Sequence, residues 1–89
     1  MPRFDRDWAA LSQEDRARFR LAVRHFVADL PTRSFRPGLR VKRVQGTANV
    51  DEMTWAPDGR ATFQFGASVQ HGPHVIWRRV GRHPILREP

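Results

Sequence analysis

The sequence predicts an α+β domain in which an N-terminal helical hairpin packs on one face of a small antiparallel β-sheet. Apolar residues recur at helical spacing over residues 4–30, and a turn-rich connector follows at 32–38. The rest of the chain consists of short apolar segments separated by Gly and Pro turns, which is typical of strands. A chain of 89 residues has room for one domain, which we expect to span residues 1–89.

The first helix is predicted around Phe4, Trp8 and Leu11. Their spacing of i, i+4 and i+7 places them on one helical face. Asp5 or Asp7 is available as the N-cap, because a short carboxylate accepts hydrogen bonds from the free amides of a first turn.

The second helix is predicted to begin at residues 12–15, a relative of the capping box, and to end before Pro31 after about 17 residues. Its apolar positions, at spacings of four, three and four, are Phe19, Val23, Phe26 and Leu30. Three arginines follow one flank at i, i+4 and i+8: Arg16, Arg20 and Arg24. We interpret this flank as a solvated helix surface in preference to an RNA-facing stripe.

Strands are predicted at 39–45, 50–56, 60–65 and 74–80, with a loop at 46–49. We expect the last strand to continue at 82–86 past a bulge at Gly81.

The segment Pro57-Asp58-Gly59 is a strong hairpin signal. The apolar positions on its two sides are Met53, Trp55, Ala61, Phe63 and Phe65. A three-residue turn would oppose Trp55 to Ala61 and Met53 to Phe63, which keeps the apolar and polar faces separate. Gly59 would then take the left-handed conformation that such a turn needs.

In this register Glu52 lies opposite Gln64, with Arg60 several residues away, so that Glu52 and Arg60 form no tight ion pair. Because two helices cover only one face of a sheet, we expect the other, polar face to stay open to water. Residues 75–80 are apolar at both parities, which is typical of a central strand. Periodicity leaves the faces of Arg78 and Arg79 open.

The charge is concentrated in the second part of the chain. Residues 1–31 hold six basic and five acidic residues, whereas residues 32–89 hold ten basic and four acidic residues. This asymmetry favours a polyanionic partner, usually nucleic acid, for the second part. The chain has no cysteine, no apolar stretch that could span a membrane and no signal peptide, so we expect a cytoplasmic protein.

Histidine is the residue type that best supports chemistry in this chain. His71 and His74 have ligand-like spacing without a third ligand, so we expect no metal site, and we interpret His25 as a solvated helix residue. His83 lies beyond Gly81 among arginines. It is either a proton donor to the leaving oxygen of a phosphodiester or a surface histidine in a basic tail.

Several segments together resemble the RelE/ParE superfamily of bacterial type II toxins over nearly the whole chain. They are the helical hairpin, Leu39-Arg-Val-Lys-Arg43, a strand carrying Glu52, Asp58-Gly-Arg-Ala-Thr-Phe63, His74-Val-Ile-Trp-Arg-Arg-Val-Gly81 and His83-Pro-Ile-Leu86. The resemblance implies that the chain is a toxin that cleaves mRNA on the ribosome and needs no cofactor. It implies that a cognate antitoxin binds and blocks the toxin, usually in a hetero-oligomer.

The resemblance also implies roles for individual residues. Glu52 matches a general base that takes the 2′-OH proton, Arg60 matches an arginine that stabilises the charge developing on the phosphate, and His83 matches the general acid. Arg78 or Arg79 matches a basic residue of the penultimate strand. The residues expected to hold the RNA backbone are Arg40, Lys42, Arg43 and Arg82.

The chain departs from the ribonuclease pattern at its C-terminal end. It has no tyrosine, Pro84 follows His83 where an acidic residue is common, and Thr54 stands where relatives often have arginine. Two alternatives therefore remain: a ParE-like toxin that inhibits gyrase, and a catalytically silent relative that acts through its antitoxin complex.

Overall fold

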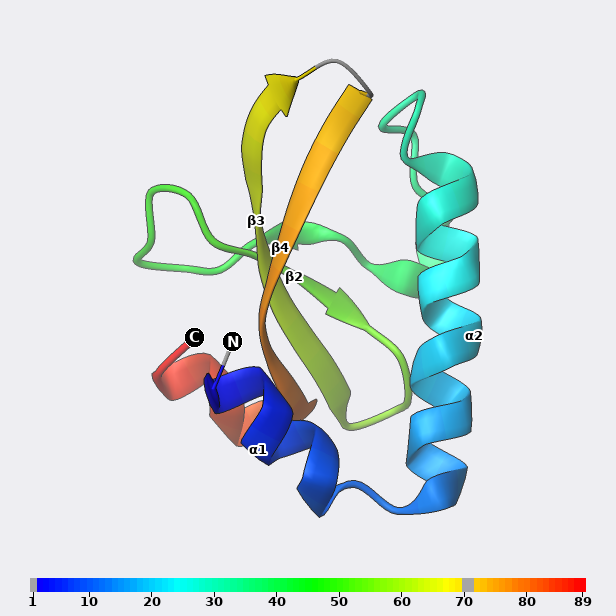
Figure 1. The fold of residues 1–89 in the computed structure, drawn as a ribbon, viewed down its shortest axis with the longest axis vertical. Helices are drawn as coiled ribbons and strands as arrows, with labels where there is room; N and C mark the ends of the chain where they lie inside the picture. Colours follow the sequence, from blue (N-terminus) through cyan, green and yellow to red (C-terminus); the bar gives the residue numbers. More distant parts are fainter. Residues whose placement is uncertain (1, 70–71) are drawn as a thin grey trace.

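The computed structural model of the chain describes residues 2–69 and 72–89 (Figure 1). Its elements are α1 (Pro2–Ala10), α2 (Gln13–Asp29), the 3₁₀ helix η1 (Pro37–Leu39), β1 (Lys42–Arg43), β2 (Asp51–Thr54), β3 (Gly59–Val69), β4 (Gly72–Arg82) and the 3₁₀ helix η2 (His83–Arg87). The strands form one antiparallel sheet in the order β1-β2-β3-β4. The predicted α+β architecture is confirmed.

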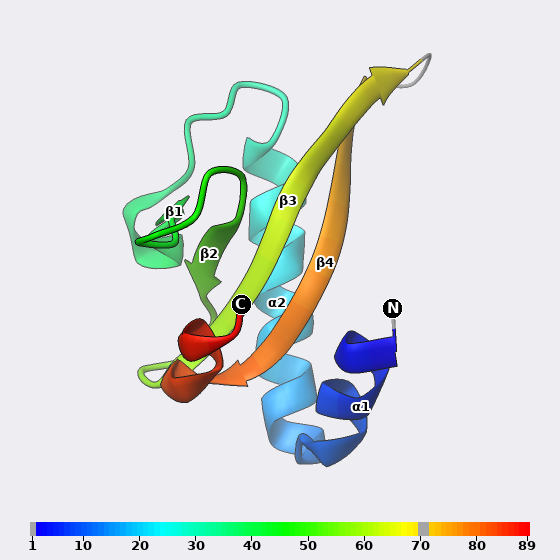
Figure 2. The same cartoon turned by 90° about the vertical axis from the view of Figure 1, so that its left-hand side faces the viewer.

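The sheet separates two layers of different character. Helix α2 covers one face, α1 packs against β4, and η2 lies against β3 and β4 on the face away from α2 (Figure 2). The side chain of Arg3 on α1 reaches the C-terminal segment and donates a hydrogen bond to the main-chain oxygen of Glu88.

The helix boundaries follow the local signals in the sequence. Ser12 caps α2, since its Oγ accepts a hydrogen bond of 3.1 Å from the amide of Asp15, and the helix ends two residues before Pro31. The expected cap of the first helix is wrong, because α1 begins at Pro2 and both Asp5 and Asp7 lie inside it. Asp7 binds Arg79 of β4 instead.

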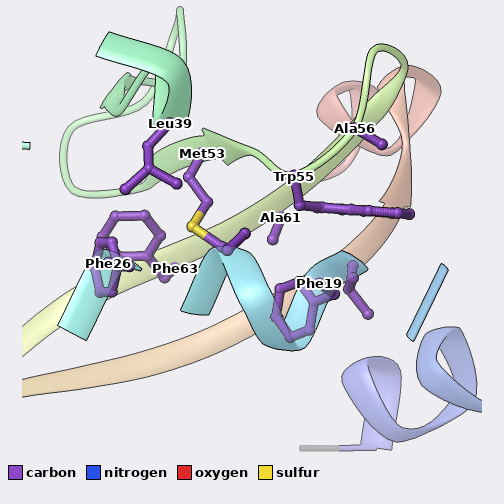
Figure 3. Packing of buried hydrophobic residues seen from close by; sticks show 10 residues of the cluster. Phe19, Phe26, Leu39, Met53, Trp55, Ala56, Ala61 and Phe63 are labelled. Carbon is purple, nitrogen blue, oxygen red and sulfur yellow. The ribbon is translucent and has the colours of Figure 1, made fainter. Parts of the chain in front are cut away.

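The core lies between α2 and the sheet (Figure 3). Phe26 of α2 is almost fully buried, and its ring centroid lies 5.0 Å from that of Phe63 on β3. Met53, Ala61 and Val80 are buried on the same face of three adjacent strands. Alternate residues of β2 and β3 are apolar, and the face on which they lie is the one that packs against α2.

The hairpin register differs from the predicted one by two residues. Met53 pairs with Ala61 and Thr54 pairs with Arg60, so the predicted partners Trp55–Ala61 and Met53–Phe63 are wrong. The amide of Trp55 bonds the carbonyl of Gly59 at 3.2 Å, so the turn is shifted by one residue and residues 56–58 lie between these two. The predicted separation of faces survives, because a shift of two residues preserves parity.

Gly59 is required for a reason other than the predicted one, since its φ is not positive. A Cβ atom placed there would lie 2.6 Å from ring carbons of Trp55. The indole packs directly over the glycine, and its Nε1 donates a hydrogen bond of 3.0 Å to the carbonyl of Arg60.

Strand β4 is an edge strand, so its assignment as a central strand is wrong. Thr62 pairs with Arg79 and Phe63 pairs with Trp77, which leaves Arg78 as an extra residue in a bulge. The bulge shifts the phase of β4, so Trp77 and Val80 share the apolar face although their parities differ. This phase shift explains why β4 is apolar at both parities.

Two other strand predictions are wrong in their extent. The bulge lies at Arg78, not at Gly81, and β4 ends at Arg82, after which residues 83–87 form η2. Of the predicted strand 39–45, only Lys42–Arg43 pairs with β2, because Pro37–Leu39 turns into η1 and Arg40 is left-handed with φ 46°.

The polar face of the sheet is not open to water where the C-terminal segment crosses it. Glu52 is 6% exposed and Thr62 is fully buried. The hydroxyl of Thr62 donates a hydrogen bond of 3.0 Å to the main-chain oxygen of Pro89. The C-terminal segment thus acts as a second cover of the sheet, which the prediction of an open polar face missed.

Candidate functional site

A polar groove of about 530 Å³ opens where β1, β2, the start of β3 and η2 meet. It is lined by Lys42, Arg43, Val44, Gln45, Gly46, Glu52, Arg60, His83 and Leu86. The groove brings together five of the nine predicted site residues: Lys42, Arg43, Glu52, Arg60 and His83. They supply one carboxylate, three permanent cations and one imidazole.

The strand register explains why Glu52 and Arg60 come close. Lys42 is the cross-strand partner of Glu52, Glu52 is the partner of Thr62, and Thr54 is the partner of Arg60. Glu52 is therefore opposite Thr62 and not Gln64, which makes Arg60 its diagonal neighbour. Opposed side chains have Cβ atoms about 5 Å apart and diagonal neighbours lie about 7–8 Å apart. Both side chains line the same groove.

Glu52 combines burial with access to the groove. The residue is 6% exposed, yet it lines the groove, and none of the described residues donates a hydrogen bond to its carboxylate. A carboxylate held in this way can accept a proton or a hydrogen bond from a group that enters the groove.

Arg60 is fixed by the turn that precedes it. Its Nη1 donates to the carbonyls of Gly59, Pro57 and Ala56 at 2.9, 3.3 and 3.4 Å. Within residues 2–69 and 72–89, its Nε and Nη2 donate to no protein acceptor. The guanidinium thus has a set position at the rim and free donors for an anion.

His83 reaches the groove because η2 begins there. Its amide donates a hydrogen bond of 2.9 Å to the carbonyl of Asp58, which ties the start of η2 to the β2–β3 turn. Pro84 follows at the first helical position, where its restricted φ favours the helix. The imidazole is exposed, so it can exchange protons with a ligand.

The two basic residues of β1 differ in their freedom. Arg43 Nε binds Asp51 Oδ1 at 2.8 Å and its Nη1 donates to the carbonyl of Ala48, so part of its charge is compensated. Lys42 is exposed. It directly opposes Glu52 across the strands and lines the groove, so it adds a positive charge there.

The structure does not place the other predicted residues in the groove. Arg79 forms a two-point ion pair with Asp7 of α1 at 2.9 and 2.8 Å. Arg82 binds Asp15 of α2 at 2.6 Å and lies over the ring of Trp55. Both arginines join a strand to a helix.

Asp7 and Arg79 stabilise each other's charged form. Burial alone would raise the pKa of Asp7, but hydrogen bonds from Arg79 and the Val80 amide, with the charges of Arg79 and Arg3, outweigh it, so the pKa lies below 3.8. The hydrogen bond to Asp7 raises the pKa of Arg79 above its ordinary value.

Two predicted arginines lie near the groove residues without lining it. Arg78 is on the polar face, where its Nη1 donates to Gln64 Oε1 at 2.9 Å and its Nε donates to the main-chain oxygen of Pro89 at 3.2 Å. The face that periodicity left open for Arg78 is therefore the polar one. Arg40 is exposed just before β1.

Sequence reasoning missed four groove residues that carry no pattern marking a site: Val44, Gln45, Gly46 and Leu86. Metal binding has no support in the described part of the chain, where no three His, Cys, Asp or Glu residues cluster. The predicted pair of His71 and His74 cannot be placed, because His71 lies outside the described residues.

No protein-family model, curated protein or solved structure matches this chain. Over residues 2–69 and 72–89, no helix combines the length and apolar character needed to cross a membrane.

Proposed function

We propose that this protein is the toxin of a type II toxin–antitoxin system, a member of the RelE/ParE superfamily that cleaves mRNA on the ribosome. The observation that carries the proposal is the convergence of Glu52, Arg60 and His83 in one groove with Lys42 and Arg43. An RNA-cleaving site needs a proton acceptor, a proton donor and cations around one phosphate, and these side chains supply all three.

The proposed reaction is transfer of a phosphodiester to its own 2′-oxygen. Glu52 takes the proton of the 2′-OH, and this oxygen forms a bond to phosphorus. The bond from phosphorus to the 5′-oxygen breaks, and His83 donates a proton to that oxygen. The products are a 2′,3′-cyclic phosphate and a 5′-hydroxyl end. Arg60 stabilises the negative charge on the phosphate oxygens in the transition state.

The surrounding charge supports a polyanionic substrate. Lys42 and Arg43 line the groove and Arg40 is exposed nearby, so an RNA backbone entering the site meets several cations. In this proposal Arg79 and Arg82 stabilise the fold, because each is engaged by an aspartate.

The proposed partners follow from the same charge. The chain has a formal net charge of +7, so an antitoxin segment with acidic and apolar residues is a suitable inhibitor. We further propose that the toxin acts in the cytoplasm, where ribosomes and mRNA are present, and forms a hetero-oligomer with its antitoxin.

The test is cleavage of mRNA by the purified protein on programmed ribosomes, with 5′ ends mapped by primer extension. New ends at A-site codons are expected for the wild type only when ribosomes are present. They should fall by at least about 100-fold for His83→Ala, the usual size of a general acid's contribution. The matched control is His25→Ala, on α2 across the sheet, which should cleave like the wild type.

Two results would contradict the proposed reaction. Wild-type activity in His83→Ala and in Glu52→Gln would remove these residues from the chemistry. Intact mRNA with a folded wild-type protein would exclude ribosome-dependent cleavage. Arrest of DNA replication would then indicate a gyrase-inhibiting toxin, and harmless expression without antitoxin would indicate a catalytically silent relative.

A further inference from the structure

The main-chain oxygens of residues 88 and 89 collect an unusual set of donors. The Pro89 oxygen accepts from Thr62 Oγ1 at 3.0 Å and from Arg78 Nε at 3.2 Å. The Glu88 oxygen accepts from Arg79 Nη1 at 3.5 Å and from Arg3 Nη2. Two neighbouring oxygens of the C-terminal segment are therefore held by three guanidinium groups and one hydroxyl.

This donor set is of the kind that proteins use to hold phosphate. Arginine guanidinium groups and hydroxyls are among the side-chain groups that contact the phosphate oxygens of nucleic-acid backbones. A phosphate group presents two anionic oxygens, so it can accept from Arg78 and from Thr62 at the same time. Thr62 is fully buried beneath the segment, and its hydroxyl is aimed at the same point.

The position that Pro89 covers lies beside the groove, on the same face of the sheet. Thr62 is the cross-strand partner of Glu52, so the two side chains share one rung and one face. Arg78 lies on this face too, because it binds Gln64 on β3. Adjacent strands are about 4.8 Å apart, so the donors beneath Pro89 lie one to two strands from Glu52. A backbone that enters the groove at Glu52 would meet this position next.

We propose that Thr62 and Arg78 form a second phosphate-binding subsite for the RNA backbone, and that residues 88–89 occupy it in the free protein and are displaced when RNA binds. The inference rests on the proposed function for the identity of the ligand. It adds a device that the proposed reaction does not need: the chain competes with its own substrate for one phosphate position.

The test uses a single-stranded RNA 10-mer whose 2′-oxygens are all methylated, so that it cannot be cleaved. Binding is followed by fluorescence anisotropy over a series of salt concentrations. The full chain is compared with a variant that ends at Arg87, and circular dichroism verifies the fold of each protein. The matched control is Glu88→Gln in the full chain, which removes the same negative charge but keeps both main-chain oxygens.

The shortened chain should bind the 10-mer about tenfold more tightly, the equivalent of one added charge-assisted contact of about 1.4 kcal/mol. Its plot of log affinity against log salt should steepen by about 0.7 for the one additional phosphate. Arg78→Gln in the shortened chain should abolish both gains. Equal affinity and slope for the full and shortened chains would overturn the inference, and so would an equal gain in Glu88→Gln, because the effect would then be one of net charge.

Hydrogen–deuterium exchange on the full chain gives a second measurement without truncation. Saturation with the methylated 10-mer should speed exchange of the amide of Glu88, which bonds the carbonyl of Ile85. Unchanged or slower exchange would contradict displacement. Neither readout requires cleavage, so failure of the proposed reaction leaves this test intact, and cleavage with no effect of the segment would refute this inference alone.

Discussion

The ion pair between Asp7 and Arg79 gives a direct test of whether Arg79 stabilises the fold or is available to bind RNA. The perturbation is Asp7→Asn, because the asparagine oxygen can still accept the hydrogen bond of 3.3 Å from the Val80 amide. The change thus removes the carboxylate charge and the two-point contact with Arg79 while keeping the size of the side chain.

The structure sets the magnitude of the expected loss. The Asp7 and Arg79 side chains are 12% and 22% exposed, so solvent screens their contact only in part. Two short charge-assisted hydrogen bonds between partly buried groups are worth about 2 kcal/mol in total. For a domain of this size, that loss lowers the Tm by about 8–16 °C.

The assay is urea unfolding followed by tryptophan fluorescence at a series of pH values. The pKa of Asp7 is lower in the folded state, so the stabilisation is complete above its ordinary pKa of about 3.8 and is lost as the pH falls through the folded value. The difference in unfolding free energy between wild type and Asp7→Asn should be constant from about pH 7 to pH 5. It should shrink toward zero as the pH falls further. Asp58→Asn, which removes a charge from an exposed turn, should stay within about 0.5 kcal/mol of the wild type.

Two results would refute the reasoning. Equal unfolding free energies for wild type and Asp7→Asn at pH 7 would mean that the ion pair does not fasten α1 to β4. A loss that persists unchanged down to pH 2 would mean that packing, and not charge, is responsible. Arg79 would then return to the set of residues available for RNA.

Two further predictions concern the turns around the sheet. Gly59→Ala should destabilise the protein by about 1–3 kcal/mol, because the new methyl group overlaps the ring of Trp55, and unfolding that matches the wild type would contradict this packing. The Asp29 carboxyl should titrate with a pKa of about 2 by NMR, since hydrogen bonds from the Arg36 side chain and amide favour its charged form. Arg36→Gln should move this pKa toward its ordinary value, and a titration near 4 in the wild type would count against the contact.

The two helices and the faces of the strands could be predicted because their signals are local. The spacing of Phe19 and Phe26 selects one side of α2, and the serine cap and Pro31 fix its ends within a few residues. Parity alone selected the buried side of β2 and β3, and it survived an error of two residues in the register.

The bulge at Arg78 could not be predicted. One extra residue in β4 changes which side chains share a face. The sequence shows this only as apolar residues at both parities, a pattern that is equally typical of a central strand. The position of the turn before Gly59 could not be predicted either, because a shift of two residues in the register keeps the same faces.

The candidate site, too, could be predicted from the sequence only in part. The residue type and its basic surroundings marked His83, whereas Glu52 and Arg60 became candidates only through the resemblance, which also supplied the proposed roles of all three. Their convergence needed the register of β2 with β3 and the turn of the chain into η2, which brings residue 83 back to the hairpin.

By itself, the sequence determined the fold class, the core face of each long element and the basic character of the second part of the chain. These properties depend on periodicity and composition, which neighbouring residues encode. Only the tertiary structure decided which arginines are free. Arg79 and Arg82 look like Arg60 in the sequence, but they bind Asp7 and Asp15, which lie 72 and 67 residues away. Such pairs form only when packing brings helices and strands together, and so they leave no local signal.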